Sequence, residues 1–423
     1  MVKWMNKGFE AFSQQKRYCI IIIIILILTV LLFYYDISYT LMPSIINSDF
    51  SNTDESYLEI FNDTILNNKT TKKILVWTTF FKNMHWESEI KQKMLSCNRL
   101  CEVTSDRNQI KDADALLFHH GDLNENDLPP SRFLHQPWIL FTLEPTTLIS
   151  GNLNWWGKIF NWTMSYRTYS TIFNPYGYFI NKTMIPVSNK LDVGFKGRVN
   201  DMFAVISRCH DDARRYKIIH ELTQHFEVDT YGACSSNKLK CNYTRFYCIP
   251  PTIIKKYKFR LAFENSNCRD YITEKYWDSL QQNVVPIVNW KDHQRNDFSL
   301  EGLKQFESEN MNVIPNSYIN IYDFDNIINA VKFITEVGEN ETLYNSFHEW
   351  KKIYTPVSSM YSGFCRLCDK LHKPFTAQVY KDLEKWFKDD TCGKNNVSLL
   401  LYMTFSVNPI FRIVEDILSP NAI

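Results

Sequence analysis

FENSNCRDYITEK, from Phe263 to Lys275, decides the fold because it leads the chain from an apolar strand through a polar turn into a helix. Thr273 occupies the N-cap position of that helix, with Glu274 and Lys275 in its first turn. Amides at a helix start point outward with positive partial charge, and a lysine adds a full charge. The turn is therefore suited to bind a diphosphate, although Glu274 and Lys275 could equally be ordinary residues on a solvated helix face.

Short apolar runs and helical periodicity alternate on both sides of this turn. The runs that predict strands are KKILVWTTF from Lys72, ADALLFHH (Ala113–His120), PWILFTLEP (Pro137–Pro145), MFAVISR after Asp201, VDTYG, FRLAFEN and VVPIV (Val284–Val288). Residues 211–226 predict a helix, because Ile218, Ile219, Leu222 and Phe226 recur at helical spacing. Two successive α/β series, joined near residues 190–200, predict two Rossmann-like domains that face one cleft. The length of 423 residues suffices for both.

The N-terminus predicts a membrane anchor. Residues 18–35, YCIIIIIILILTVLLFYY, are uncharged, and as a helix they would span about 27 Å, roughly one hydrocarbon core. Lysines and Arg17 precede the run, so we expect a cytoplasmic tail over residues 1–17 and a luminal body. A cleaved signal peptide is the alternative, but its apolar region would usually be shorter and end in small residues. The polar residues 36–71 predict a stem.

Charge and cysteine content narrow the class of protein. The formal net charge of +1 argues against a nucleic-acid partner, which would call for a basic excess. Ten of the eleven cysteines follow the anchor, and Cys97/Cys101 and Cys365/Cys368 form two close pairs. Such spacing could bind zinc or support redox chemistry, but in a luminal body structural disulfides are favoured.

Seven Asn-x-Ser/Thr sequons are consistent with N-glycosylation without deciding it. The candidates are Asn62, Asn68, Asn161, Asn181, Asn242, Asn340 and Asn396.

The segment Phe263–Lys275 resembles the signature of the alpha-1,3-fucosyltransferase family, whose fold is the two-domain GT-B type. Other segments are similar to family segments and follow in family order: ADALLFHHGDL, the Glu-Pro of FTLEP, FNWTMSYR with NPYGY (Phe160–Tyr178), SRCHDDARR before VDTYG, and FCRLC. The similarity covers roughly residues 72–392.

The resemblance implies an inverting transfer of L-fucose from GDP-β-L-fucose to O3 of a GlcNAc residue in a glycoprotein or glycolipid glycan. Glu144 matches the proposed general base, and Arg214 and Lys275 match the cations that hold the GDP diphosphate. Asn265, Tyr271 and Glu274 match residues that contact the nucleotide sugar. No cofactor or metal site is implied, although a divalent cation could stimulate turnover. Without the resemblance, Glu144 would be a plain loop carboxylate.

The resemblance also implies a place in the cell and a division of the chain. We expect a single-pass type II protein of the Golgi membrane with its catalytic body in the lumen. The expected parts are an acceptor-side domain (72–199), a GDP-fucose-binding domain (200–355), a C-terminal return segment with CxxC (356–392) and a tail (393–423). Residues 289–313 are polar and irregular, and we expect them to form an inserted loop.

The chain departs from the family pattern at two places. Arg208 stands where the family usually has asparagine, and Thr168–Thr171 replace a run of basic and acidic residues. The second departure bears on acceptor recognition, so the sequence does not define which GlcNAc is used.

Two other functions remain open. A metal-dependent GT-A glycosyltransferase would use a DxD pair, for which Asp112/Asp114 and Asp323/Asp325 are candidates. A catalytically inactive, lectin-like member of the family is the second alternative.

The cysteine pairs suggest a specific link between chain segments. Cys97 and Cys101 lie in KQKMLSCNRLC, which predicts a helix, and Cys365 and Cys368 could share a face of a C-terminal helix. In two-domain folds of this class the chain end commonly returns to the first domain. We therefore predict two bridges from Cys97 and Cys101 to Cys365 and Cys368, while the two local pairings stay open as the alternative.

Overall fold

The computed structural model describes residues 58–65, 70–149, 151, 153–182, 194–235, 249–291, 313–388 and 392. The predicted cytoplasmic tail, the membrane anchor, residues 292–312 of the predicted insertion and residues 393–423 lie outside this part. Among the residues that are described, no helix combines the length and the apolar character that a membrane span needs.

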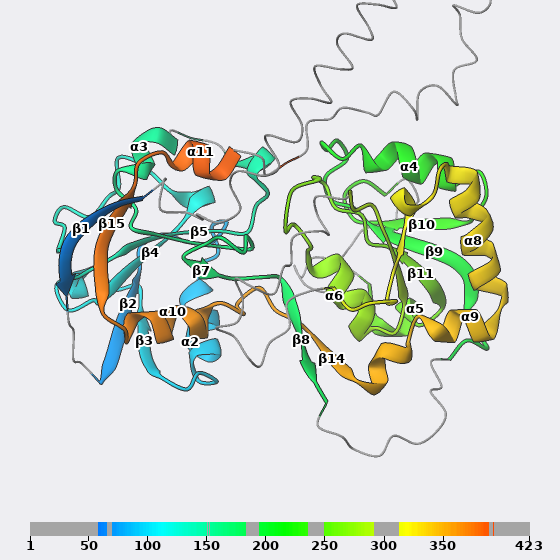
Figure 1. Ribbon diagram of the computed structural model, residues 1–423, viewed down its shortest axis with the longest axis horizontal. Helices are drawn as coiled ribbons and strands as arrows, with labels where there is room; N and C mark the ends of the chain where they lie inside the picture. The colour runs from blue at the N-terminus through cyan, green and yellow to red at the C-terminus, as the bar shows by residue number, and fades with distance from the viewer. Residues whose placement is uncertain are drawn as a thin grey trace, which may run out of the picture. The chain divides into compact units, whose positions relative to one another are not determined.

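The first lobe is built on a six-stranded parallel sheet with strand order β3-β2-β4-β5-β6-β7 (Figure 1). Its strands are β2 (Thr71–Val76), β3 (Leu100–Thr104), β4 (Ala115–His119), β5 (Trp138–Thr142), β6 (Trp162–Ser165) and β7 (Ile172–Phe173). Every residue of β4 and β5 is buried, which explains why their sequences, ALLFH and WILFT, are apolar except for the last residue of each. Two helices accompany the sheet, α2 (Trp86–Met94) and α3 (Leu153–Gly157).

The second lobe is built on a five-stranded parallel sheet with strand order β10-β9-β11-β12-β13. Its strands are β9 (Val199–Val205), β10 (Val228–Tyr231), β11 (Tyr257–Leu261), β12 (Val285–Val288) and β13 (Ile319–Asn320). Its helices are α4 (Arg215–Leu222), α5 (Pro251–Ile254), α6 (Glu274–Gln281), α8 (Ile327–Glu339) and α9 (Glu341–Ser346). Two parallel sheets with interspersed helices confirm the predicted α/β class.

The end of the chain returns to the first lobe. Strand β14 (Tyr354–Ser358) pairs antiparallel with β8 (Gly177–Asn181), and α10 (Phe364–Leu371) then packs on α2. Strand β15 (Phe375–Tyr380) pairs antiparallel with β1 (Leu58–Ile65), and α11 (Leu383–Lys388) contacts α3 (Figure 1). The predicted stem over residues 36–71 was therefore too long, because β1 and the first residue of β2 belong to the folded body.

Apolar packing is continuous between the two lobes. One cluster of buried side chains includes Tyr166 and Tyr176 from the first lobe and Tyr271 and Trp277 from the second. Gly177 permits this contact, since a Cβ atom on it would lie 2.3 Å from the Trp277 ring. Any larger residue at position 177 would push α6 away from β8.

Four disulfides are present among the described residues. Cys97–Cys365 and Cys101–Cys368 confirm the predicted bridges and exclude the local pairings. The predicted helix around Cys97 and Cys101 was wrong, since α2 ends at Met94, Cys97 lies in the following turn and Cys101 lies in β3. Cys365 and Cys368 do lie in a helix, α10. The other two bridges, Cys209–Cys234 and Cys268–Cys392, were not predicted.

The asparagines of the sequons differ in their exposure to solvent. Asn161 is 7% exposed, and its Oδ1 accepts hydrogen bonds from Arg132 and from the backbone of Trp138, so this candidate is buried in the folded body. Asn181 and Asn340 are exposed. The side chains of Asn62, Asn68, Asn242 and Asn396 lie outside the described part.

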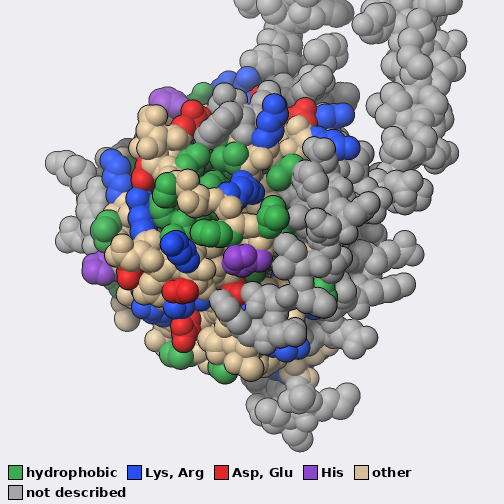
Figure 2. All heavy atoms as spheres, turned by 90° about the vertical axis from the view of Figure 1, so that its left-hand side faces the viewer, with side chains coloured by type: hydrophobic (Ala, Val, Ile, Leu, Met, Phe, Trp, Pro, Cys, Tyr) green, Lys and Arg blue, Asp and Glu red, His purple; other side chains and the backbone are tan. Residues whose placement is uncertain are grey.

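One face of the molecule carries side chains of both charges. On the face in Figure 2, lysine and arginine side chains are interspersed with acidic and hydrophobic ones and do not form one basic field. The mixture of signs on this face is in line with the formal net charge of +1.

The two parallel bridges should contribute unequally when they are removed in sequence. With Cys97–Cys365 intact, Cys101–Cys368 closes a ring of only about eight residues, which is worth about 2–3 kcal/mol in the chain-entropy model. Removing both bridges opens a loop of 268 residues, which should cost about 5–6 kcal/mol more. Thermal unfolding of Cys101→Ser/Cys368→Ser and of the quadruple serine variant measures both steps. Equal losses for the two steps would contradict this arrangement.

Candidate active site

A fully buried carboxylate organises the segment that decides the fold. Strand β11 ends at Leu261, and Glu264 follows it with a backbone clamped by the side chain of Asn289, which donates to the Glu264 carbonyl and accepts from its N–H. The Glu264 carboxylate accepts hydrogen bonds from the backbone N–H of Thr273 at 2.7 Å and from its hydroxyl at 2.8 and 2.9 Å. Thr273 is the N-cap of α6, as predicted, but its own side chain makes no capping hydrogen bond. The Glu264 carboxylate accepts from its backbone N–H instead.

Lys275 is held at the start of α6 by three oxygen atoms. Its Nζ donates to the Thr273 hydroxyl at 2.8 Å, to Glu274 Oε1 at 3.2 Å and to Glu264 Oε2 at 3.3 Å. Burial acts to lower the pKa of Lys275, but the carboxylates of Glu264 and Glu274 outweigh it and raise that pKa, so the ammonium group stays charged. Glu264 is fully buried, whereas the Glu274 side chain is 43% exposed.

Arg214 and Arg215 have different environments at the start of α4. Arg214 is exposed and adopts a left-handed backbone conformation with φ of 52°. Arg215 is buried, lies 2.7 Å from Asp211 in an ion pair, and donates to the carbonyls of Phe263 and Arg208. Arg215 therefore ties α4 to the end of β11, a role that the sequence analysis missed because helical spacing does not reveal it. Lys291 lies close enough to Arg214 for the two charges to interact.

The remaining predicted donor residues lie in the same loop as Glu264. Asn265 is half-buried, and its Oδ1 is enclosed without a hydrogen-bond partner in the described part of the chain. Tyr271 is buried, and its ring packs edge-on against Tyr166 and Tyr176 of the first lobe. Asn265 thus has unused hydrogen-bonding capacity, while Tyr271 is part of the packing between the lobes.

Glu144 stands at the carboxyl end of β5, where ligands bind to parallel sheets. Its backbone N–H donates to Thr142 Oγ1, and the Tyr176 hydroxyl donates to the neighbouring Leu143 carbonyl. Burial raises the pKa of the Glu144 carboxyl, with Arg208 and Lys275 of the second lobe opposing the rise and Glu274 adding to it. The positive charges of Lys275, at the start of α6, and of Arg208, after β9, therefore favour the ionised form of the Glu144 carboxyl.

Direct hydrogen bonds join loops of the first lobe, at the ends of β5 and β6, to the loop of the second lobe that precedes α6. The hydroxyls of Thr147 and Ser266 lie 2.7 Å apart, and Thr168 donates from its N–H and its hydroxyl to Asp270 Oδ2. Thr171, at the end of the run that departs from the family pattern, is hydrogen-bonded to the Tyr380 hydroxyl at 2.9 Å within the first lobe. Thr168 thus takes part in the contact between the two lobes, whereas Thr171 makes a hydrogen bond within the first lobe.

The DxD pairs have other partners. Asp114 is buried, accepts from the Lys73 N–H and lies 3.7 Å from Lys72 Nζ, while Asp323 accepts from the Asn320 side chain. The residues that are described contain one group of three metal-type ligands, Cys101, Cys368 and His372, and both of its sulfurs belong to a disulfide.

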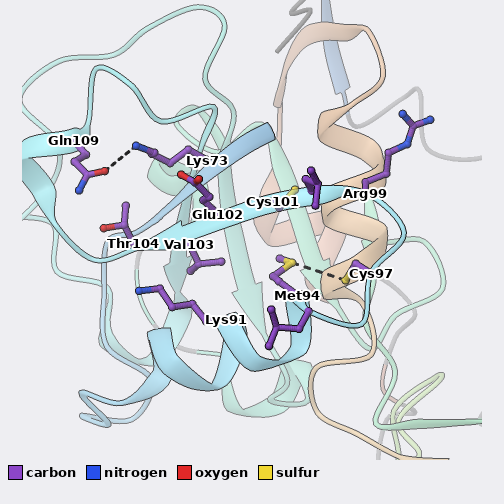
Figure 3. A pocket seen from close by; sticks show the side chains of 12 residues that line it. Lys73, Lys91, Met94, Cys97, Arg99, Cys101, Glu102, Val103, Thr104 and Gln109 are labelled. Carbon is purple, nitrogen blue, oxygen red and sulfur yellow. Dashed lines mark hydrogen bonds between the residues drawn. The ribbon is translucent and has the colours of Figure 1, made fainter. Parts of the chain in front are cut away.

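A cavity of about 610 Å³ lies elsewhere in the first lobe. Figure 3 shows it between α2 and the edge strand β3, with Lys91 and Met94 of the helix opposite Val103 and Thr104 of the strand. Its lining includes Cys97 and Cys101 of the two parallel bridges but none of the predicted donor or catalytic residues. The cavity is therefore separate from the candidate active site.

Comparison with known proteins identifies both lobes. Residues 195–386 match a family model described as "Glycosyltransferase family 10 (fucosyltransferase) C-term", and residues 69–177 match "Fucosyltransferase, N-terminal". Among solved structures, an alpha1,3-fucosyltransferase with GDP-fucose covers 76% of this chain and 96% of its own, at 16% identity and a TM-score of 0.44.

Curated relatives give the same family. Alpha-(1,3)-fucosyltransferase fut-5 of Caenorhabditis elegans is 30% identical over 345 residues, which cover 77% of this chain and 86% of the relative. Alpha-(1,3)-fucosyltransferase 7 of Rattus norvegicus is 32% identical over 332 residues, 75% of this chain and 80% of the relative. The predicted enzyme class is confirmed, and neither the GT-A alternative nor the lectin-like one is favoured. The chain belongs to glycosyltransferase family 10, the fucosyltransferases.

Proposed function

We propose that this enzyme transfers L-fucose from GDP-β-L-fucose to O3 of a GlcNAc residue in a glycan, with inversion at the fucose C1. The observation that carries the proposal is that the loop after Glu144 is hydrogen-bonded to the loop before α6, through Thr147 and Ser266, and that the charges of Lys275 and Arg208 act on the pKa of Glu144. An inverting transfer needs a base on the acceptor side and cations on the leaving diphosphate, and this arrangement supplies both. The alpha-1,3 linkage follows the names of the relatives.

Glu144 acts as the general base in this proposal. It takes the proton from the acceptor O3–H while that oxygen attacks the fucose C1, and the bond from C1 to the β-phosphate oxygen breaks. GDP leaves with the additional negative charge, which Lys275 and Arg214 stabilise. Raising the pKa of Glu144 by burial makes the carboxylate a stronger base than an exposed glutamate.

Donor binding should displace Glu274 from Lys275. All three N–H groups of the ammonium are engaged in the free enzyme, so a phosphate oxygen must replace one acceptor. Glu274 is the partner with the greater exposure and can turn towards solvent or towards the nucleotide sugar, whereas Glu264 is enclosed. The enclosed Asn265 Oδ1 is suited to accept a hydrogen bond from the nucleotide sugar, and Tyr271 supports the loop that carries it.

We also propose that the enzyme is a single-pass type II protein of the Golgi membrane, with this body in the lumen. The apolar run over residues 18–35 and the basic residues before it support an anchor with a cytosolic N-terminus. Four disulfides support an oxidising compartment. The residues described here supply charge for GDP without a metal, so a divalent cation would at most stimulate turnover.

Turnover of GDP-fucose tests the proposed function and its base together. The full chain in detergent should fucosylate at least one GlcNAc-containing acceptor from a panel of LacNAc, LacdiNAc and N-glycan core structures. Glu144→Gln should lower kcat by roughly 10²-fold or more, while GDP affinity stays near that of the wild type. Linkage analysis of the product by NMR should place fucose on O3. An unchanged kcat in the variant would refute the role of Glu144.

Lys275 and Arg214 should both contribute to GDP binding, but only Lys275 should also contribute to thermal stability. Lys275→Ala should weaken GDP binding by roughly 10- to 100-fold, the scale of a charged hydrogen bond. It should also lower Tm, since Glu264 keeps no cation in its buried site. Arg214→Ala should weaken GDP binding without lowering Tm, because Arg214 is exposed. Calorimetry with GDP and thermal unfolding measure the two effects, and Lys217→Ala on the same helix is the control. GDP affinity unaltered in both variants would place the donor site elsewhere.

Arg208 should set the acid limb of the pH profile. Its positive charge lowers the pKa of Glu144, so Arg208→Ala should raise that pKa. Since the base must be deprotonated, activity should then be lost at a higher pH on acidification. The profile of kcat/KM against pH in the variant, the wild type and Lys217→Ala measures the shift. An acid limb that stays in place or moves to lower pH would show that Arg208 does not act on Glu144.

A further inference from the structure

We propose that the Cys268–Cys392 disulfide and Thr146 form an interlobe latch that positions Glu144 against the donor-binding loop. The latch joins the donor loop of the second lobe, the chain end and the loop that carries the base. The inference rests on the proposed function, because it assigns the latch to the same general base. It adds positioning residues that lie outside the family motif roles given above.

The disulfide fixes the chain end to the donor loop. Cys268 is fully buried and lies three residues after Asn265 and five before Thr273, inside the turn that decides the fold. Cys392 comes from the end of the described chain, 124 residues later, and the two residues also form an isolated antiparallel bridge. Both sulfurs belong to the cluster of apolar side chains that spans the two lobes.

Thr146 connects this disulfide to the base. It begins the short 3-10 helix Thr146–Leu148, two residues after Glu144, and it is 5% exposed. Its hydroxyl lies 3.7 Å from Cys268 Sγ and also contacts Cys392 Sγ. Sulfurs in a disulfide carry no hydrogen, so the Thr146 hydroxyl is the donor. The side chain therefore holds the Glu144 loop against both halves of the bridge.

The latch is one of several contacts between the loops of the two lobes, and this row of contacts is called the seam. The Thr147–Ser266 hydrogen bond is next to it on both loops, and Thr168–Asp270 is the second crossing. These crossings are individual hydrogen bonds between side chains or from one backbone group, whereas the disulfide is covalent and its Cys268 half is fully buried. Its loss would leave the seam free to shift.

Small shifts of the seam should affect chemistry more than donor binding. The cations Lys275 and Arg214 lie entirely in the second lobe, so GDP binding does not need the first-lobe loop. The base must reach the acceptor oxygen while that oxygen faces the fucose C1, and a misplacement of about 1 Å can cost about 10²-fold in rate. The latch should therefore act on kcat and leave GDP affinity almost unchanged.

The experiment compares two disulfide removals in the full chain in detergent. Cys268→Ser/Cys392→Ser should lower kcat at least about 10-fold and change GDP affinity less than about threefold, measured at a temperature where thermal unfolding shows both variants folded. Cys101→Ser/Cys368→Ser, which opens a bridge remote from the base, should keep kcat within about twofold despite a lower Tm. Thr146→Val should reproduce the loss in kcat with the disulfide intact, and Thr146→Ser, which keeps the hydroxyl, should restore most of it.

Three outcomes would overturn the latch. The first is a kcat within twofold of the wild type in both Cys268→Ser/Cys392→Ser and Thr146→Val. The second is GDP affinity that falls in step with kcat, which would make the bridge a donor-site element. The third is an equal loss of kcat in the two disulfide variants, which would mean a general effect of stability. Failure of the proposed function is distinct, since the wild type would then turn over no GDP-fucose in the same assay.

Discussion

The buried carboxylate of Glu264 is the constraint on which the rest of the site depends. A fully enclosed carboxylate must be compensated by hydrogen bonds and a cation, and Thr273 and Lys275 supply them at the start of α6. This requirement fixes the end of β11, the N-terminus of α6 and the ammonium group relative to one another. A diphosphate then meets an ammonium group that is already in place, and the rearrangement expected on binding is confined to the exposed side chain of Glu274.

Contacts between the C-terminal segment and earlier parts of the chain hold the body of the enzyme together. Strand β15 pairs with β1, α10 is bridged twice to the region of α2 and β3, and Cys392 reaches the donor loop. These links explain how a base in one lobe and cations in the other can share a site. In the proposed mechanism each lobe contributes half of the chemistry, and disulfides attach the C-terminal segment to both lobes.

Features of this structure that depend on neighbouring residues could be predicted from the sequence, whereas most features that depend on contacts between distant segments could not. Strands β2, β4, β5, β9, β10, β11 and β12, helix α6 and the N-cap at Thr273 could be predicted because periodicity and capping chemistry act within a few residues. The remaining strands, several of them short or at a sheet edge, were not predicted. The bridges to Cys365 and Cys368 were predicted from the return of the chain, although the helix assumed for Cys97 was wrong. Glu264 stood in the quoted motif without a role, and Arg215, Cys392 and Thr146 gave no signal, because burial and contacts between distant segments give them their functions.

A crystal structure of the enzyme with GDP and an acceptor containing GlcNAc would test the central claim most directly. The account predicts that Lys275 Nζ contacts a phosphate oxygen, that Glu264 keeps its bonds to Thr273, and that a Glu144 carboxylate oxygen lies within hydrogen-bonding distance of the acceptor O3. GDP bound away from the start of α6, or an acceptor O3 out of reach of Glu144, would contradict it.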